Sequence, residues 1–360
     1  MSARRLVAYT HGVDHPAARF RIGQFIPSFE RAGWDVALRP QSPEQPRDSP
    51  IAWRPARTVH QRLRFALRRR RRLNDLADAA GFDVAFVSRD LLEGDPAWER
   101  ELARRNPRTV FDFDDAIHLG RKREHFARAC EGAAWVTAGN EHLAAVARKF
   151  TDRVSVVPTV VDTDAIPPPP DPAAGRPLRL GWLGSDRSIR ETLHAHAAMF
   201  ADLQAELGFE LVVVSKPRRE MPDRRLRWRH VEWSPATEAR IADHFDVGIM
   251  PLVDDEFQRL KCGCKLLQYM AAGLPSIATP IGINPSLLGG GRGIAATDRD
   301  AWAGAIARLR DPDLRRTIGA TARPYVERHY SVAAWFPRLF DVVESVRLGA
   351  TPRTVALAAD

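Results

Sequence analysis

The sequence contains few cysteines and no long run of apolar residues. Its 360 residues include three cysteines, Cys130, Cys262 and Cys264, so one thiol stays unpaired in any disulfide scheme, as expected in a reducing compartment. No stretch of about 18 apolar residues occurs, and the apolar run at residues 6–9 is too short for a secretory signal. Cys262 and Cys264 flank a glycine, but no second Cys/His cluster accompanies them. We therefore expect a cytoplasmic protein without a transmembrane helix or a metal site.

Acidic residues are missing from one strongly basic segment. Residues 54–72 contain nine arginines, from Arg54 to Arg72, and no acidic residue, in a chain of formal charge +9. Leu63, Phe65 and Leu67 interrupt the arginines, but they alternate and do not form a clean helical stripe. Three interpretations follow: a solvated helix face, contact with an anionic membrane surface, or contact with nucleic acid. No zinc-finger spacing or RNA-binding aromatic signature supports nucleic acid, which we do not expect as a partner.

The length and composition fit a globular protein of two domains, with 44% apolar and 28% charged residues. Short apolar segments alternate with helical stretches, which is typical of parallel sheets covered by helices on both faces. A proline-rich stretch marks a boundary because proline does not fit inside a regular element. We expect a first domain over residues 1–165, a linker over 166–177, a second domain over 178–330 and a C-terminal helix over 331–348.

Eleven strands and a first helix follow from the same patterns. The expected strands cover residues 6–10, 34–38, 83–88, 109–114, 135–138 and 154–157 in the first domain, and 178–183, 210–215, 231–233, 246–250 and 276–279 in the second. The first helix is expected over residues 20–32.

Residues 246–291 organise the rest of the chain. The strand over 246–250 leads into a polar loop, and helical spacing begins at Gly263 and ends before Gly273 and Pro275. The first N–H groups of a helix attract phosphate, and glycine lets an anion approach the backbone closely. Lys261 and Lys265 stand beside that helix start and can neutralise an anion. The alternative is a simple turn with two solvated lysines.

The sequence from Gln268 to Pro275, QYMAAGLP, and the strand that follows it carry a resemblance. They resemble the nucleotide-sugar-binding half of the GT-B "group 1" glycosyltransferases, which are glycogen-synthase-like, retaining enzymes. The resemblance implies an α/β fold of two Rossmann-like domains that face each other across a cleft. It also implies a C-terminal helix that crosses back to the first domain.

The chain departs from the family at two glutamate positions. In the family, two glutamates eight residues apart contact the sugar and the ribose, and here these positions hold Leu260 and Gln268. Gln268 can hydrogen-bond ribose hydroxyls, whereas Leu260 cannot replace a carboxylate. Glu256 or Asp255, from the same loop, can take over the contact to the sugar. The identity of the donor therefore stays open.

Other donor-binding residues follow from the resemblance. The strand over 178–183 runs into a glycine–serine turn that corresponds to the loop where the family binds the diphosphate, and Lys216 ends the next strand. The residues we assign to donor binding are Gly12, Gly184, Ser185, Arg187, Lys216, Glu256, Lys261, Gly263, Cys264, Lys265 and Gln268.

In the first domain, the loop at Gly12 opens a Rossmann-like unit, and Arg19 and Arg21 after it are candidates for acceptor binding; surface arginines at a helix start are the alternative. The polar segment that follows the strand over 109–114 stands where α/β sheets bind ligands. In the resembled enzymes a His or Asp at a comparable point reaches the transferred sugar. We therefore predict His118 and Asp115 as the catalytic residues.

The leading hypothesis is a metal-independent hexosyltransferase-like enzyme that moves a sugar from a nucleotide-sugar, with retention of configuration. The nucleotide-sugar is a co-substrate, and no cofactor is expected. The acceptor is a glycan or a lipid-linked molecule in polysaccharide, glycolipid or other glycoconjugate synthesis. If residues 54–72 bind lipid, the protein is peripheral at the inner face of the membrane. Two alternatives are a non-catalytic GT-B paralogue that binds a sugar nucleotide, and a sugar-nucleotide epimerase.

Overall fold

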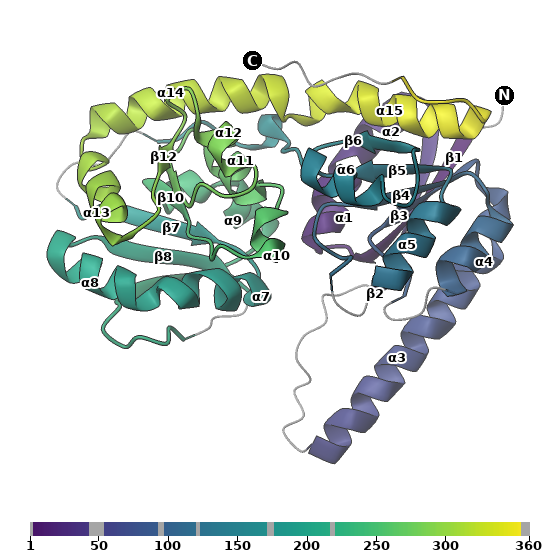
Figure 1. Cartoon of the computed structure of the whole chain (residues 1–360), viewed down its shortest axis with the longest axis horizontal. Coiled ribbons are helices and arrows are strands. Elements are labelled where there is room, and N and C mark those ends of the chain that lie inside the picture. The colour runs from purple at the N-terminus through teal and green to yellow at the C-terminus, as the bar shows by residue number, and fades with distance from the viewer. Residues whose placement is uncertain are drawn as a thin grey trace. The chain divides into compact units, whose positions relative to one another are not determined.

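The computed structural model describes residues 3–42, 54–92, 97–119, 123–170, 176–216 and 220–353. The chain forms two compact units, one of Met1–Thr159 with Trp335–Asp360 and one of Val160–Ala334 (Figure 1). The expected linker over 166–177 therefore begins inside the second unit, and its residues 171–175 lie outside the described residues. Within the described ranges no helix is both long and apolar enough to span a membrane.

The first unit is built on a six-stranded sheet in the order β2-β1-β3-β4-β5-β6, and every neighbouring pair is parallel. Its strands are β1 (Arg4–Gly12), β2 (Trp34–Ser42), β3 (Val84–Ser88), β4 (Thr109–Phe113), β5 (Trp135–Ala138) and β6 (Val154–Val156). The chain leaves β1 for β2 on one side and then returns to β3 on the other side. The strand order therefore reverses between β1 and β3.

Seven helices described in the first unit accompany this sheet: α1 (Pro16–Arg21), α2 (Ile26–Arg31), α3 (Arg54–Ala77), α4 (Ala97–Arg105), α5 (Arg123–Gly132), α6 (Glu141–Ala147) and α15 (Val332–Leu348). The single helix expected over 20–32 is instead two helices, with a 3₁₀ turn at Gly23–Phe25 between them. Pro27 explains the break, because it lacks the N–H that a continuous helix would need and fits only in the first turn of α2.

The C-terminal helix α15 belongs to the first unit for most of its length and packs on α2. Phe336 and Phe340 have their ring centroids 5.2 and 6.2 Å from that of Phe29. Arg4 of β1 adds a contact of its guanidinium with the Phe340 ring and a 3.4 Å ion pair with Glu344. The predicted return of the last helix to the first domain is confirmed.

The second unit contains another six-stranded parallel sheet, in the order β12-β11-β10-β7-β8-β9. Its strands are β7 (Arg179–Leu183), β8 (Glu210–Ser215), β9 (Trp228–Glu232), β10 (Val247–Met250), β11 (Ser276–Ala278) and β12 (Ile294–Ala295). Its α-helices are α7 (Asp186–Ser188), α8 (Ala197–Leu207), α9 (Pro235–Ala239), α10 (Glu256–Arg259), α11 (Cys264–Ala271), α12 (Asn284–Leu288), α13 (Arg299–Arg308) and α14 (Pro312–His329).

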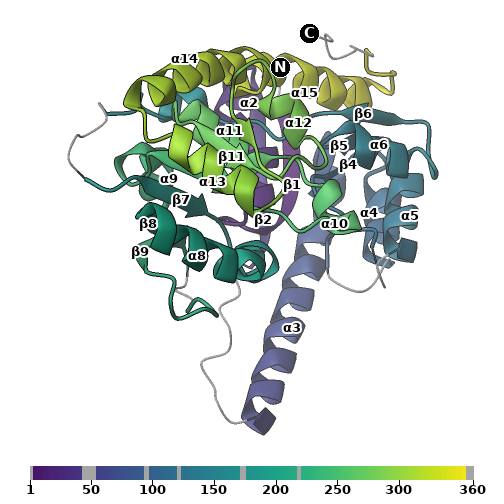
Figure 2. The ribbon, with the colours of Figure 1, turned by 60° about the vertical axis from the view of Figure 1, so that its left-hand side comes forward.

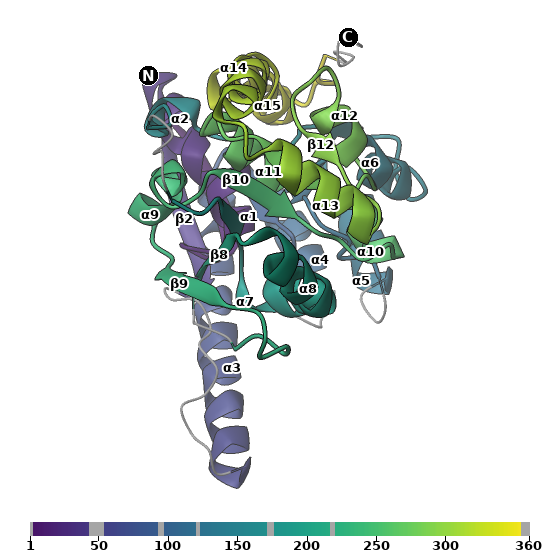
Figure 3. The ribbon, with the colours of Figure 1, turned by 90° about the vertical axis from the view of Figure 1, so that its left-hand side faces the viewer.

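Two apolar cores lie on the two faces of the second sheet, because successive strand residues point to opposite sides. Leu211 and Val213 belong to the core with α8 and α13, whereas Val212 and Val214 belong to the core with α11, α12 and α14. Figure 3 shows α8 and α11 separated by the strands of this sheet. Two six-stranded parallel sheets with helices confirm the predicted α/β class of two Rossmann-like domains.

Gly181 of β7 provides a test of the packing between the second sheet and Phe245. A Cβ atom at Gly181 would lie 1.9 Å from Cγ of Phe245, whose ring is buried. Gly181→Ala is therefore expected to lower the free energy of unfolding by about 1–3 kcal/mol. The matched control is Gly304→Ala on α13, where a Cβ meets no atom within 4 Å, and it should raise stability by up to about 1 kcal/mol. Thermal unfolding followed by circular dichroism measures both, and equal melting temperatures for the two variants would contradict the prediction.

Candidate functional site

The carboxyl edge of the second sheet, at β7 and β10, is the first candidate site. The chain leaves β7 for β8 on one side, whereas it leaves β10 for β11 on the other side, so the strand order reverses between β7 and β10. Open α/β sheets bind their ligands at this kind of reversal, because the two following loops diverge there. The loops in question contain Gly184 and Ser185 after β7, and residues 251–263 after β10.

The start of α11 needs glycine for two reasons. Gly263 precedes the helix with φ of +65°, a left-handed conformation that favours glycine, and a Cβ atom there would lie 2.5 Å from Cδ1 of Leu287. No side chain caps this helix start. N–H groups in the first turn of a helix attract anions, so the start of α11 is a candidate anion site.

Lys265 connects this helix start with the loop that follows β7. Its Nζ lies 2.9 Å from Oγ of Ser188 and 5.2 Å from the ring centroid of Trp182. A Cβ at Gly184 would lie 2.9 Å from Cε of Lys265, so glycine leaves room for the lysine stem. Ser185 caps α7 by accepting a hydrogen bond from the N–H of Ser188. The structure thus brings Gly184, Ser185 and Lys265 together, and their role in donor binding stays a prediction.

Two further predicted cations surround one aromatic ring of α10. The guanidinium of Arg187 lies 4.9 Å from the ring centroid of Phe257, and Nζ of Lys261 lies 5.5 Å from it. Arg187 also forms a 2.5 Å ion pair with Glu191. Arg187 directly precedes Ser188, which contacts Lys265. Arg187, Lys261 and Lys265 therefore lie at the same edge of the sheet, where their charges favour an anionic ligand.

The remaining donor-binding predictions lie around the same loops. Gln268 is buried one turn into α11, and Cys264 Sγ donates to its Oε1 at 3.7 Å. Glu256 is exposed in the first turn of α10. Lys216 follows β8, one strand further along the sheet, with Nζ 6.0 Å from the ring centroid of Trp233. These placements leave the roles of the four residues as predictions.

In the first unit, the carboxyl edge at β1 and β3 contains a pair that the sequence did not predict. Nε2 of His11, at the end of β1, lies 2.6 Å from Oδ1 of the buried Asp90, two residues after β3. Gly12, which we predicted from sequence, adjoins this pair. His11 lies at the end of one strand and Asp90 just after another, but only the observed strand order shows that these two strands are neighbours at the reversal of the first sheet.

Arg89 and His15 lie beside that pair. Arg89 has φ of +74°, unusual for a residue with a side chain, and its Nη2 lies 2.5 Å from Oδ2 of Asp115. Although burial opposes it, the carboxylates of Asp115 and Asp114 raise the pKa of Arg89. Burial, together with Arg89 and His11, lowers the pKa of His15 to about 3, so its imidazole is neutral at pH 7. The first edge therefore holds paired charges and a neutral ring.

The predicted catalytic residues, Asp115 and His118, follow β4. Asp115 is held by Arg89 and by the N–H of Ala116, at 3.1 Å. The ring of His118 leans on Phe126 of α5, with 5.4 Å between ring centroids. Asp115 is thus linked to the edge at His11 through Arg89, whereas His118 packs against a helix. Their catalytic roles stay predictions.

Of the two predicted acceptor-binding arginines, Arg21 lies inside the first unit. Its Nε and Nη2 donate to the buried carboxylate of Asp112 at 3.1 and 2.6 Å, and its Nη1 donates to the carbonyl of Val157 at 2.5 Å. Thr137 also donates to Asp112, at 2.6 Å. We interpret Arg21 as a structural residue that ties α1 to β4. Arg19 is half-buried, with its guanidinium over the Phe20 ring, and its role stays a prediction.

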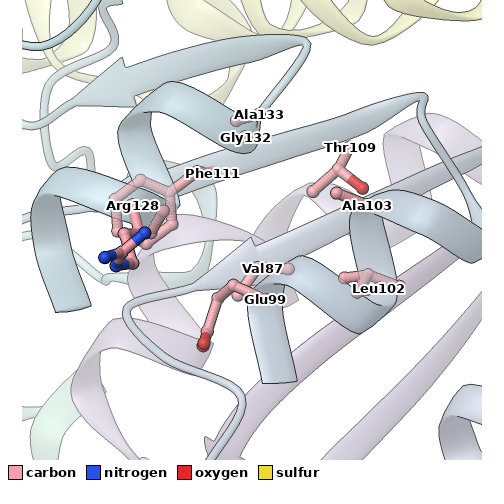
Figure 4. Close-up of a pocket in the computed structure, with 10 residues that line it drawn as sticks. Val87, Glu99, Leu102, Ala103, Thr109, Phe111, Arg128, Gly132 and Ala133 are labelled. Atoms are coloured by element: carbon pink, nitrogen blue, oxygen red, sulfur yellow. The ribbon is translucent and has the colours of Figure 1, made fainter. Parts of the chain in front are cut away.

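A small cavity lies elsewhere in the first unit, between α4, α5 and β4 (Figure 4). Its volume is about 10 Å³, enough for one water molecule and far too little for a sugar nucleotide. Among the described residues, no group of three or more His, Cys, Asp or Glu side chains could hold a metal ion.

Comparison with known proteins gives a family match within the second unit and solved structures with the same fold. Residues 178–311 match the family model described as "Glycosyl transferases group 1". A comparison with curated protein sequences gives no match.

Solved structures match nearly the whole chain. A glycosyltransferase from Rickettsia africae has a TM-score of 0.67 at 12% identity, with 95% of this chain and 98% of that one covered. HepE of Anabaena, in complex with UDP-glucose, has a TM-score of 0.66 at 12% identity, covering 94% and 99%. The α,α-trehalose 6-phosphate synthase from Burkholderia multivorans has a TM-score of 0.62 at 12% identity, covering 99% and 100%. At these identities the likeness shows the shared fold.

Replacing Arg21 tests its structural role. Arg21→Met leaves the buried carboxylate of Asp112 without its guanidinium, so the free energy of unfolding should fall by about 3–5 kcal/mol. Arg19→Met, two residues earlier on the same helix, is the matched control and should cost less than about 1 kcal/mol. Urea unfolding followed by circular dichroism measures both. A stable Arg21→Met protein would mean that the Arg21–Asp112 pair contributes nothing to the first unit.

Proposed function

Residues 178–311 belong to the group 1 glycosyl transferases, within a chain that has the GT-B fold, and from this we propose that the protein transfers a sugar from a nucleotide-sugar to an acceptor hydroxyl. In the proposed transfer, the acceptor oxygen bonds to the anomeric carbon, and the bond from that carbon to the diphosphate breaks. The hydroxyl proton passes to the departing diphosphate, and the configuration is retained. The family resemblance of the second unit supports both points.

The observation that carries this proposal is the meeting of Lys265 with the loop after β7, directly beside the start of α11. A diphosphate bound there would meet the N–H groups of the first turn and the ammonium of Lys265. Negative charge grows on the diphosphate as the sugar leaves, so cations fixed at this place lower the barrier. Arg187 and Lys261 supply further positive charge around Phe257.

We propose a UDP-sugar as the donor. Support comes from HepE, a structure with the same fold that was determined with UDP, with UDP and glucose, and with UDP-glucose. Gln268, which replaces a glutamate of the family pattern, would bind the ribose, and Glu256 would bind the sugar in place of the carboxylate that Leu260 lacks. No metal takes part in the proposed reaction.

The first unit would hold the acceptor side. Because the carboxylate of Asp90 only accepts hydrogen bonds, it keeps the proton of His11 on Nε2. In the neutral imidazole, Nδ1 of His11 then accepts a hydrogen bond, which suits a hydroxyl group of the acceptor. We propose that His11 orients the acceptor and that Asp90 orients His11, with Asp115 and His118 as the neighbouring predicted residues.

Nucleotide binding at Lys265 is tested by thermal unfolding with UDP-, GDP- and ADP-sugars. A ligand at 100 times its dissociation constant stabilises the folded protein by about 2.7 kcal/mol. We expect this shift with a UDP-sugar, its loss in Lys265→Ala, and its retention in Lys149→Ala, a control of equal charge change at an exposed position of the first unit. No shift with any of the three nucleotides would refute the proposed donor site. A shift without transfer of the sugar to any acceptor, and so without release of UDP, would favour a binding protein.

The role of the His11–Asp90 pair is tested by Asp90→Asn. The amide can donate to Nε2 and reverse the tautomer of His11, so we expect kcat to fall about 10- to 100-fold. The stabilisation by the donor should stay unchanged, because the donor phosphates bind in the second unit. Asp83→Asn, at the amino end of the same strand β3, is the control and should keep full activity. Equal kcat in the two variants would remove His11 from the proposed mechanism.

A further inference from the structure

The helix α3 contains the basic segment, and hydrogen bonds near its C-terminal end hold it to the first sheet. Its 24 residues give a length of about 36 Å at 1.5 Å per residue. All three views show it running away from the strands of its own unit (Figure 2). At the attached end, the buried Arg72 donates to the carbonyls of Thr10 and Leu91, at 2.8 and 2.7 Å. These two residues adjoin His11 and Asp90, so α3 is anchored at the candidate acceptor edge.

An exposed apolar row covers residues 59–67 of α3. Val59, Leu63 and Leu67 recur every four residues, and their exposures are 65%, 58% and 59%. Residues at this spacing lie on one face of a helix. Phe65, which alternates with Leu63 and Leu67, lies off this row, and Val59 extends the row by one turn. A row of exposed apolar side chains marks an interaction surface far more often than single ones do.

Exposed arginines flank this row on both sides. At 100° per residue, Arg62 and Arg69 lie on one side of the row, and Arg57 and Arg71 lie on the other, whereas Arg70 lies in line with it; all five are exposed. No acidic residue occurs between positions 54 and 72. The helix therefore combines an apolar face with dense positive charge, the pattern of helices that lie in the interface of an anionic membrane.

The combination of an apolar row with flanking arginines favours one of three partners: a second copy of the chain, a nucleic acid or a lipid bilayer. A second copy of α3 would bring arginines against arginines, and like charges repel. A nucleic-acid backbone would pair with the arginines but would leave the apolar row in water. A bilayer with anionic headgroups satisfies both features, since phosphates bind the arginines and the apolar row enters the headgroup region.

We propose that α3 docks the first unit on an anionic lipid bilayer through the row Val59, Leu63 and Leu67 and its flanking arginines. The anchor at Thr10 and Leu91 ties the helix that carries this row to the edge at His11 and Asp90. The acceptor is then a lipid-linked molecule that reaches this edge from the bilayer, a second step that rests on the function proposed above.

Vesicle sedimentation tests the docking step with the full chain and no sugar nucleotide. Wild-type protein should sediment with vesicles of phosphatidylglycerol and phosphatidylcholine and stay in solution with phosphatidylcholine alone. Leu67→Glu should lower the bound fraction about tenfold or more, whereas Leu348→Glu, at 62% exposure on α15, should not change it. A fourfold Arg→Gln variant at positions 62, 69, 70 and 71 should also lose binding. Its control carries the same change at the exposed positions 224, 308, 310 and 328.

Three results would overturn the docking step. These are wild-type protein that ignores phosphatidylglycerol vesicles, full binding by Leu67→Glu, or equal losses in the test and control variants. A dimer that Leu67→Glu dissociates would assign the row to a second copy, and binding to duplex DNA without vesicle binding would assign it to nucleic acid. Circular dichroism confirms that each variant is folded. Since no donor is present, a failure here is separate from a failure of the proposed transfer.

Discussion

The parallel arrangement of both sheets is the constraint on which the rest of the structure depends. Parallel strands cannot be joined by tight turns, so each connection crosses the sheet and covers a face with helices. Side chains for ligand binding are then concentrated at the carboxyl edges of the strands. In the first sheet the strand order reverses beside β1, and in the second it reverses beside β7. His11 with Asp90, and Lys265 with Ser188, lie at these two places.

The two edges differ in the way they hold charge. In the second unit, Lys265 contacts a hydroxyl and an aromatic ring, and Lys261 faces an aromatic ring. In the first unit, carboxylates pair with both Arg89 and His11. The basic side chains near the start of α11 suit an anionic diphosphate, in agreement with the proposed donor on the second unit.

Local patterns predicted the elements of this fold better than the contacts between them. The start of α11 followed from Gly263, since glycine and helical spacing are visible within a few residues. The pair of His11 and Asp90 was missed because 79 positions separate them and strand order cannot be read from spacing. Arg21 looked exposed for a similar reason: its partner Asp112 lies 91 positions away. Contacts within one element are local, but the sites here require knowledge of which strands are neighbours.

The basic segment shows why amino-acid composition alone cannot tell which arginines hold the fold together and which are exposed for binding. Arg71 and Arg72 are consecutive, yet Arg71 is exposed and Arg72 is buried on backbone carbonyls. A helix turns by about 100° per residue, so adjacent arginines face different surroundings. Arg72 fixes α3 to the edge of the first sheet, and this attachment lets the exposed arginines present an ordered charged face. The proposed membrane surface therefore depends on the anchor, and a single run of arginines encodes both.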